Sequence, residues 1–156
     1  MKYYISEYWA MVNSTDANLR EEGKTKWDES AKKYGPYFES IKNMLPKNFI
    51  EEFNKNNWFH DFQFNSMHVF NLGEQITNVE LYISHNSISY KIILSGVKGV
   101  SFNIPTTQSW LFGKLTWGYT EFELNDDKIW IIRILCDIEC EIEVLFETIN
   151  ILDLSK

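Results

Sequence analysis

The stretch that decides the fold is residues 129–146, IWIIRILCDIECEIEVLF, because its apolar residues follow the two-residue period of β-strands. Its first part, 129–135, is apolar on both faces, which is typical of a strand in the middle of a sheet. Its second part alternates apolar residues with Asp137, Glu139, Glu141 and Glu143. These four carboxylates should therefore share one face of a strand, spaced about 7 Å apart along it.

The same end of the chain carries the whole net charge of −7. Residues 1–120 hold 12 basic and 12 acidic residues, whereas residues 121–156 hold 3 basic and 10 acidic ones. Two further acidic residues alternate in the preceding strand-like segment, so six carboxylates could line one surface. The alternatives are a solvated outer face and a divalent-cation site. We predict a partner-binding face composed of Glu121, Glu123, Asp137, Glu139, Glu141 and Glu143.

Further toward the N-terminus, the apolar period changes from helical to strand-like near His60. Ser6 and Asp16 are typical N-caps, and Gly35-Pro36 predicts the end of one helix and the start of the next. After residue 57, six or seven short strands follow with connections too short for helices, which favours antiparallel hairpins. The prediction is an α+β single domain, 1–156. Its N-terminal helices, within 1–57, should pack on a six- to seven-stranded antiparallel meander sheet formed by 58–156.

The composition restricts both the partner and the compartment. A hydrophobic share of 44% and an aromatic share of 16% are enough to bury a core without disulfides. The acidic balance argues against nucleic acid and against an anionic membrane as partners. No apolar stretch approaches the roughly 20 residues of a membrane span, and the first residues lack the apolar core of a signal peptide. We therefore expect a cytoplasmic protein, in which Cys136 and Cys140 are more typical of buried thiols than of a hairpin disulfide.

Conventional catalytic and metal-binding motifs are not found in the sequence. It contains no nucleophile elbow, no phosphate-binding glycine loop and no compact His or Cys ligand spacing. We therefore expect no enzymatic activity, no cofactor and no metal. The alternative is a small-molecule-binding or enzymatic domain with a cleft near His60, Asp61 and His68. Adjacent residues of a strand point to opposite faces, so sequence alone favours a structural role for His60-Asp61.

Several segments resemble an uncharacterised family of small bacterial cytoplasmic proteins, a domain of unknown function. The matching segments are Met1-Lys2-Tyr3-Tyr4 with Glu7-Tyr8-Trp9, then His60-Asp61, then residues 115–121 (LTWGYTE), and finally residues 141–151. The resemblance implies a helical N-terminal part before an antiparallel sheet that begins at His-Asp. It implies no activity.

In size, class and charge the chain also resembles bacterial immunity proteins, which bind basic toxin domains. Taken with the acidic segment, this likeness predicts a protein-binding protein, in the specific case an immunity-type inhibitor of a basic toxin domain. Trp117 or Trp130 could anchor such an interface, because tryptophan is enriched at interface centres. The sequence leaves the oligomeric state open.

Overall fold

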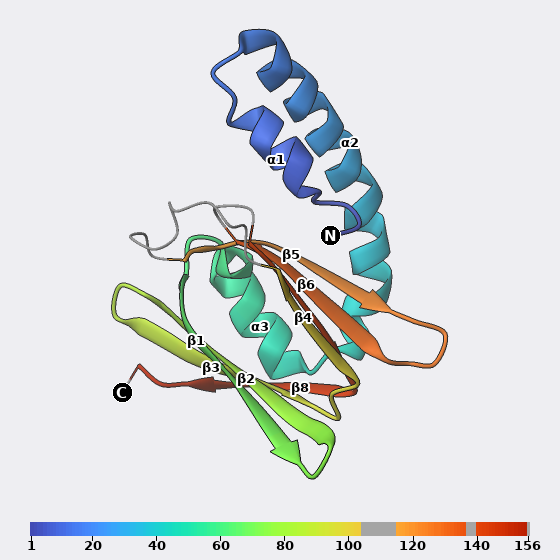
Figure 1. The fold of residues 1–156 in the computed structure, drawn as a ribbon, viewed down its shortest axis with the longest axis vertical. Coiled ribbons are helices and arrows are strands. Elements are labelled where there is room, and N and C mark those ends of the chain that lie inside the picture. The colour runs from blue at the N-terminus through green and yellow to red at the C-terminus, as the bar shows by residue number, and fades with distance from the viewer. Residues whose placement is uncertain (104–114, 137–139, 156) are drawn as a thin grey trace.

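The computed structural model describes residues 1–103, 115–136 and 140–155. These residues form an α+β fold, as predicted (Figure 1). The helices are α1 (Ser6–Val12), α2 (Ala17–Ile41) and α3 (Lys47–Lys55), with the short 3-10 turns η1 (Lys42–Met44) and η2 (Asn57–Phe59). The strands are β1 (Gln63–Leu72), β2 (Gln75–His85), β3 (Ile88–Ser95), β4 (Gly99–Asn103), β5 (Trp117–Leu124), β6 (Trp130–Cys136), β7 (Glu141–Phe146) and β8 (Thr148–Asp153).

The strands form two antiparallel sheets of four, so the prediction of one meander sheet is wrong. The first sheet has the order β1-β2-β3-β8, and the second has the order β4-β7-β6-β5. The chain passes between the sheets twice, from β3 to β4 and from β7 to β8. The two crossings lie side by side, because Glu147 donates its backbone N–H to Ser95 and Lys98 donates to Leu145. The glycines at 96 and 99 mark an interruption in sequence, but the pattern does not show that the strands change sheet.

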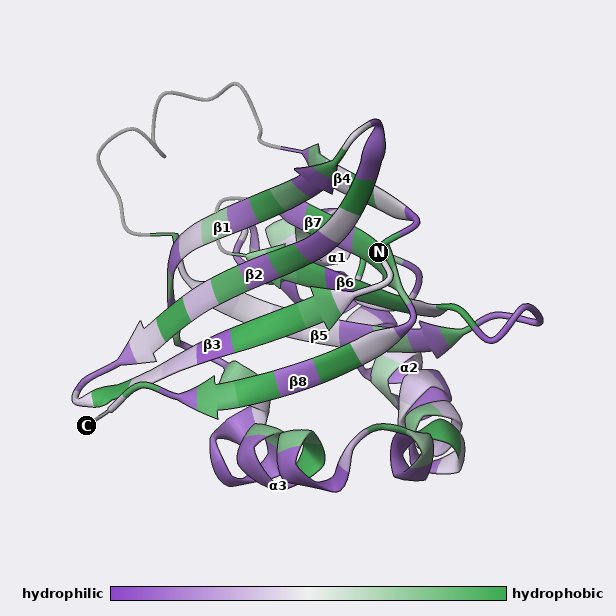
Figure 2. Ribbon diagram, turned by 90° about the horizontal axis from the view of Figure 1, so that it is seen from below, coloured by the Kyte–Doolittle hydropathy of each residue, from purple (hydrophilic) through white to green (hydrophobic). Residues whose placement is uncertain are grey.

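The core lies between the two sheets, where inward residues of every strand except β4 are buried. Along the strands of the first sheet, hydrophobic and hydrophilic residues alternate (Figure 2). Helix α3 closes one side, since it contacts β8 and its Phe49 and Phe53 rings contact Phe122 of β5. The apolar stripe of α3 is therefore buried in the core that both sheets share.

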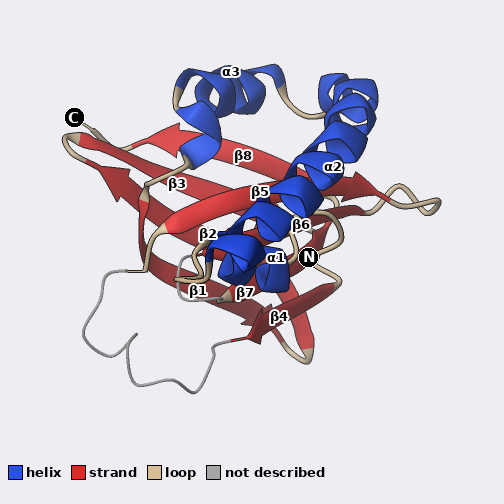
Figure 3. Cartoon of the chain, turned by 90° about the horizontal axis from the view of Figure 1, so that it is seen from above, coloured by secondary structure: helices blue, strands red, loops and turns tan. Residues whose placement is uncertain are grey.

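Helix α2 crosses the second sheet near β5, beside α1 (Figure 3). Asp16 caps its first turn as predicted, accepting hydrogen bonds from the N–H groups of Asn18 and Leu19. The predicted boundary at Gly35-Pro36 is wrong, because α2 continues through Pro36 to Ile41. Tertiary packing accounts for this continuity. Tyr34, before the proline, accepts the backbone N–H of Phe122, and Tyr37, after it, accepts that of Leu124, both on the edge strand β5.

Two local features agree with the residue pattern. Strand β1 has a register shift between Phe64 and Ser66, and residues 125–127 (Asn-Asp-Asp) lie in the turn between β5 and β6. Ser6, in contrast, is the first residue of α1 and not its cap, because Ile5 occupies the N-cap position. None of the described helices has both the length and the apolar character required to cross a bilayer.

Candidate functional site

The outer side of the second sheet carries four of the six predicted partner-binding residues, and we call it the acidic face. It comprises Glu121 and Glu123 on β5 and Glu141 and Glu143 on β7, the two strands that pair with β6. The other two, Asp137 and Glu139, lie outside the described residues. The strand alternation predicted correctly that the described carboxylates share a face. It did not predict what covers them.

Glu121 is a buried structural carboxylate, with 1% of its surface exposed. Its oxygens accept three backbone N–H bonds from the N-terminal segment, from Lys2 at 2.8 Å, Tyr3 at 2.6 Å and Tyr4 at 2.5 Å. A carboxylate that accepts three backbone N–H bonds holds the N-terminal segment firmly against β5. In this conformation Glu121 has no surface to offer a partner.

The remaining carboxylates of the acidic face are in ion pairs. Arg133, on β6, reaches Glu143 at 2.6 Å and Glu123 at 2.8 Å. The ammonium of Lys2 also contacts Glu123 at 2.8 Å, and the amino group of Met1 contacts Glu141 at 3.0 Å. Three carboxylates thus meet three cations, and Glu121, which accepts backbone N–H groups instead, leaves one net negative charge on the acidic face.

The pKa values of this network follow the pairing. Burial tends to raise the pKa of Glu123, but its hydrogen bonds to Lys2 and Arg133 outweigh burial and hold the pKa below its ordinary value. Burial likewise tends to lower the pKa of Arg133, and its two carboxylate partners raise it. Both shifts favour the charged pair over the neutral one.

The two predicted aromatic anchors belong to the core. Trp117 has no exposed surface, and its indole N–H donates to Thr120 at 2.7 Å. Trp130 is 7% exposed and packs beside Phe122. Neither ring can anchor a partner without leaving the core.

A second region contains a pocket, which we call the aromatic pocket. It is a cavity of about 250 Å³ where the start of β5 meets the end of β6 and α1. Its lining includes Trp9, Trp117 and Tyr119, together with His60 and Asp61. His60 also borders a neighbouring cavity of about 140 Å³. His60 and Asp61, for which the sequence alone favours a structural role, thus line a cavity.

A left-handed turn positions His60 and Asp61. Asn57, Trp58, Phe59 and Asp61 have φ values of 49°, 60°, 60° and 71°, a conformation that costs residues other than glycine roughly 1–2 kcal/mol each. Packing overcomes this cost, because Phe59 is fully buried and touches the rings of five other aromatic residues. Strained backbone of this kind clusters at functional sites.

A β-bulge shapes the floor of the aromatic pocket. The register of β5 against β6 shifts between Trp117 and Tyr119, which places Gly118 opposite no partner residue. A Cβ atom on Gly118 would lie 2.7 Å from the carbonyl oxygen of Leu135. Only glycine allows this approach, and the bulge sends Trp117 into the core while Tyr119 borders the cavity. No sequence motif indicates this, although Gly118 within a strand-like run is a bulge signal.

His60 and Asp61 form a contact pair on the pocket lining. Nδ1 of His60 lies 3.0 Å from a carboxylate oxygen of Asp61, and the exposed fractions of the two side chains are 31% and 69%. The His60 ring meets Tyr119 edge-on at 5.0 Å. His68 is not part of this group: it lies on the outer side of the first sheet, where its ring packs against Tyr82. The predicted cleft therefore contains two of its three residues.

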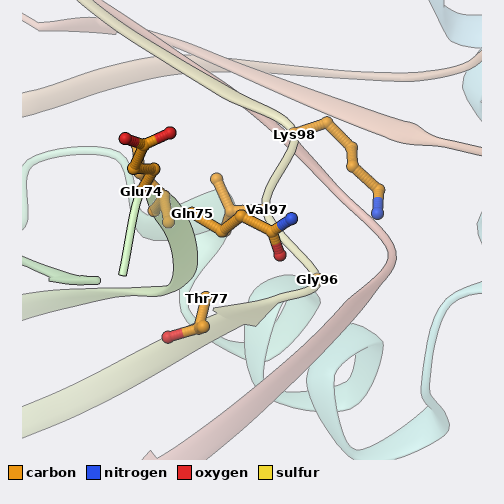
Figure 4. Close-up of a pocket in the computed structure, with 7 residues that line it drawn as sticks. Glu74, Gln75, Thr77, Gly96, Val97 and Lys98 are labelled. Atoms are coloured by element: carbon orange, nitrogen blue, oxygen red, sulfur yellow. The ribbon is translucent and has the colours of Figure 1, made fainter. Parts of the chain in front are cut away.

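A larger groove of about 600 Å³ lies between the β1–β2 hairpin and the β3–β4 connection, but its charged groups do not converge. Figure 4 shows that the carboxylate of Glu74 and the ammonium of Lys98 point away from each other. Lys98 instead pairs with Glu147 at 2.7 Å. Across the described parts of the chain, no group of three His, Cys, Asp or Glu side chains could hold a metal ion.

Comparison with known proteins gives no family assignment. No protein-family model matches the chain, and no curated protein matches it in sequence.

Proposed function

We propose that this chain is a small acidic binding protein of the cytoplasm, without enzymatic activity, and that its partner is a basic protein. Its specific form would be an immunity-type inhibitor that covers a basic toxin domain. The charge balance of the described surface carries the proposal. Nine Lys and Arg side chains are already in ion pairs with carboxylates. Exposed acids such as Asp126 and Asp127 have no ion pair within the described residues.

A negative surface on which most of the described cations are already engaged attracts basic partners from solution and disfavours acidic ones. The acidic face contributes less to this field than the sequence predicts, because Lys2 and Arg133 neutralise most of it. The attraction therefore arises from the surface as a whole, and a partner contact on the acidic face is expected at Glu143, the most exposed of its four carboxylates at 38%.

The proposal is tested by capturing partners from the native organism at low and at high ionic strength. We expect a partner with a basic isoelectric point whose association rate falls steeply with added salt. Reversal of Asp126 and Asp127 to lysine should slow association. The matched control, reversal of Asp28 and Glu29 on α2, should slow it equally if the whole field acts. A partner whose binding ignores both salt and these reversals contradicts the proposal.

A small-molecule-binding or enzymatic role near His60 and Asp61 is the second candidate. The observation that favours it is the cavity that an imidazole and a carboxylate line together. A thermal-shift screen against charged and neutral metabolites tests it, because a ligand of the folded state raises Tm. A stabilising ligand whose effect disappears in His60→Ala supports this candidate, and a screen without one contradicts it.

A further inference from the structure

We infer that the aromatic pocket binds an organic cation of the size of one side chain, namely the ammonium or guanidinium group of a lysine or arginine on the basic partner. The inference rests on the proposed function for the source of the cation. It names a site on this chain that does not involve the acidic face.

Charge is the first support. Among the described residues that line the aromatic pocket, Asp61 alone has a fixed charge, and none of them is Lys or Arg. With 69% of its side chain exposed, Asp61 can turn toward an incoming group without breaking a buried network. Its carboxylate contrasts with those of the acidic face, because its ion-pair partner among the described residues is His60 and not a Lys or Arg.

The walls are the second support. Trp9 and Tyr119 line the cavity, and indole and phenol rings attract cations through their negative faces, whereas Trp117 borders it from the core. Trp9 and Tyr119 are also in ring contact with each other at 5.4 Å, which fixes the wall on the α1 side. An aromatic wall with one carboxylate at its border repels anions and favours a cation over a neutral group of equal size.

The volume is the third support. A cavity of about 250 Å³ is smaller than the roughly 300–1,000 Å³ that typical small-molecule sites occupy. It suits one side chain better than a nucleotide or another large cofactor. The left-handed turn and the bulge at Gly118 form the cavity within the fold itself, so binding needs little rearrangement.

The test uses the full chain and n-butylammonium chloride, which reproduces the end of a lysine side chain, with n-butanol as its neutral match. NMR titration should show saturable shifts of the indole N–H signal of Trp9 and of the Gly118 amide. We expect Asp61→Asn to weaken binding about five-fold, because the charge is lost while asparagine still accepts a positive φ. The control Asp126→Asn removes an equal charge elsewhere and should leave the affinity unchanged.

Equal affinity for n-butanol and n-butylammonium overturns the inference, and so does an Asp61→Asn variant that binds the amine as tightly as the parent chain. The partner measurement separates this inference from the proposed function. If a basic partner binds Asp61→Asn as tightly as the parent, the pocket inference fails and the proposed function stands. If the amine binds through Asp61 but no basic partner is captured, the proposed function fails and a free amine becomes the ligand.

Discussion

The acidic face and the aromatic pocket hold carboxylates in opposite circumstances. Glu121 of the acidic face is buried and accepts three backbone N–H bonds, whereas Asp61 of the pocket is mostly exposed and contacts His60. The comparison teaches that a row of acids on a strand need not be a docking surface. Strand alternation determines which side chains share a face, but the rest of the chain determines whether that face stays uncovered.

The largest expected effect on stability comes from removing Glu121, which holds the N-terminal segment on the acidic face. Glu121→Ala leaves the N–H groups of Lys2, Tyr3 and Tyr4 without their acceptor. We expect the free energy of unfolding to fall by about 3 kcal/mol, since hydrogen bonds to a charged group stabilise more than neutral ones. Urea unfolding followed by tryptophan fluorescence measures the change.

The matched variant is Glu123→Ala, which removes a partly exposed carboxylate from the same strand. It should lower the free energy of unfolding by only about 1 kcal/mol, because its ion pairs are partly solvated. Equal losses in the two variants would mean that Glu121 is no more structural than its neighbour, and the comparison would break.

A smaller effect, of opposite sign, is expected at the pocket. Asp61→Gly relieves the left-handed backbone at φ 71° and removes an exposed side chain, so the free energy of unfolding should rise by about 0.5 kcal/mol. Asn86→Gly in the β2–β3 turn, at φ 54°, is the control and should give a similar gain. Of the two, only Asp61→Gly should lose n-butylammonium binding. A destabilised Asp61→Gly would show that this carboxylate is structural after all.

The smallest expected effect is on how the free energy of unfolding changes with pH. The pKa of Glu123 is lowered in the folded protein, so its contribution to stability is complete above about pH 5 and is lost as the pH falls through the folded pKa. Glu123→Gln should flatten the decline of stability in this range by a few tenths of a kcal/mol. Lys2→Met removes one of the two cations and should flatten it in part. Thermal unfolding recorded from pH 7 to pH 3 measures both variants. If stability falls with pH as steeply in Glu123→Gln as in the parent chain, the ion pairs of Glu123 do not stabilise the fold.

Local patterns predicted most of the elements and little of their assembly. The alternation in 129–146 correctly indicates a central strand, β6, and its neighbour β7, because burial on one or both faces leaves a direct mark on sequence. The change of sheet after β7 leaves no such mark, because β7 and β8 have the same period of two. The continuity of α2 through Pro36 was not predicted, because it depends on two tyrosine hydroxyls that bind a strand more than 80 residues away.

The candidate sites show the same limit. The strand positions of the four described carboxylates could be read from sequence, but the cover provided by residues 1–4 could not, since it depends on contacts across more than 110 residues. The pocket depends on positive φ values at Trp58 and Phe59, which local preference disfavours and only aromatic packing enforces. Of its features, the adjacent His60 and Asp61 and the glycine at 118 were visible beforehand.

The hydrogen bonds that Glu121 accepts from the N–H groups of Lys2, Tyr3 and Tyr4 also affect the order in which the chain folds during synthesis. Residues 2–4 leave the ribosome well before their acceptor, which follows 117 to 119 residues later. Closing so long a loop is slow compared with forming the β2–β3 hairpin. Residues 2–4 should therefore dock on Glu121 in one of the last folding steps, after the second sheet has assembled.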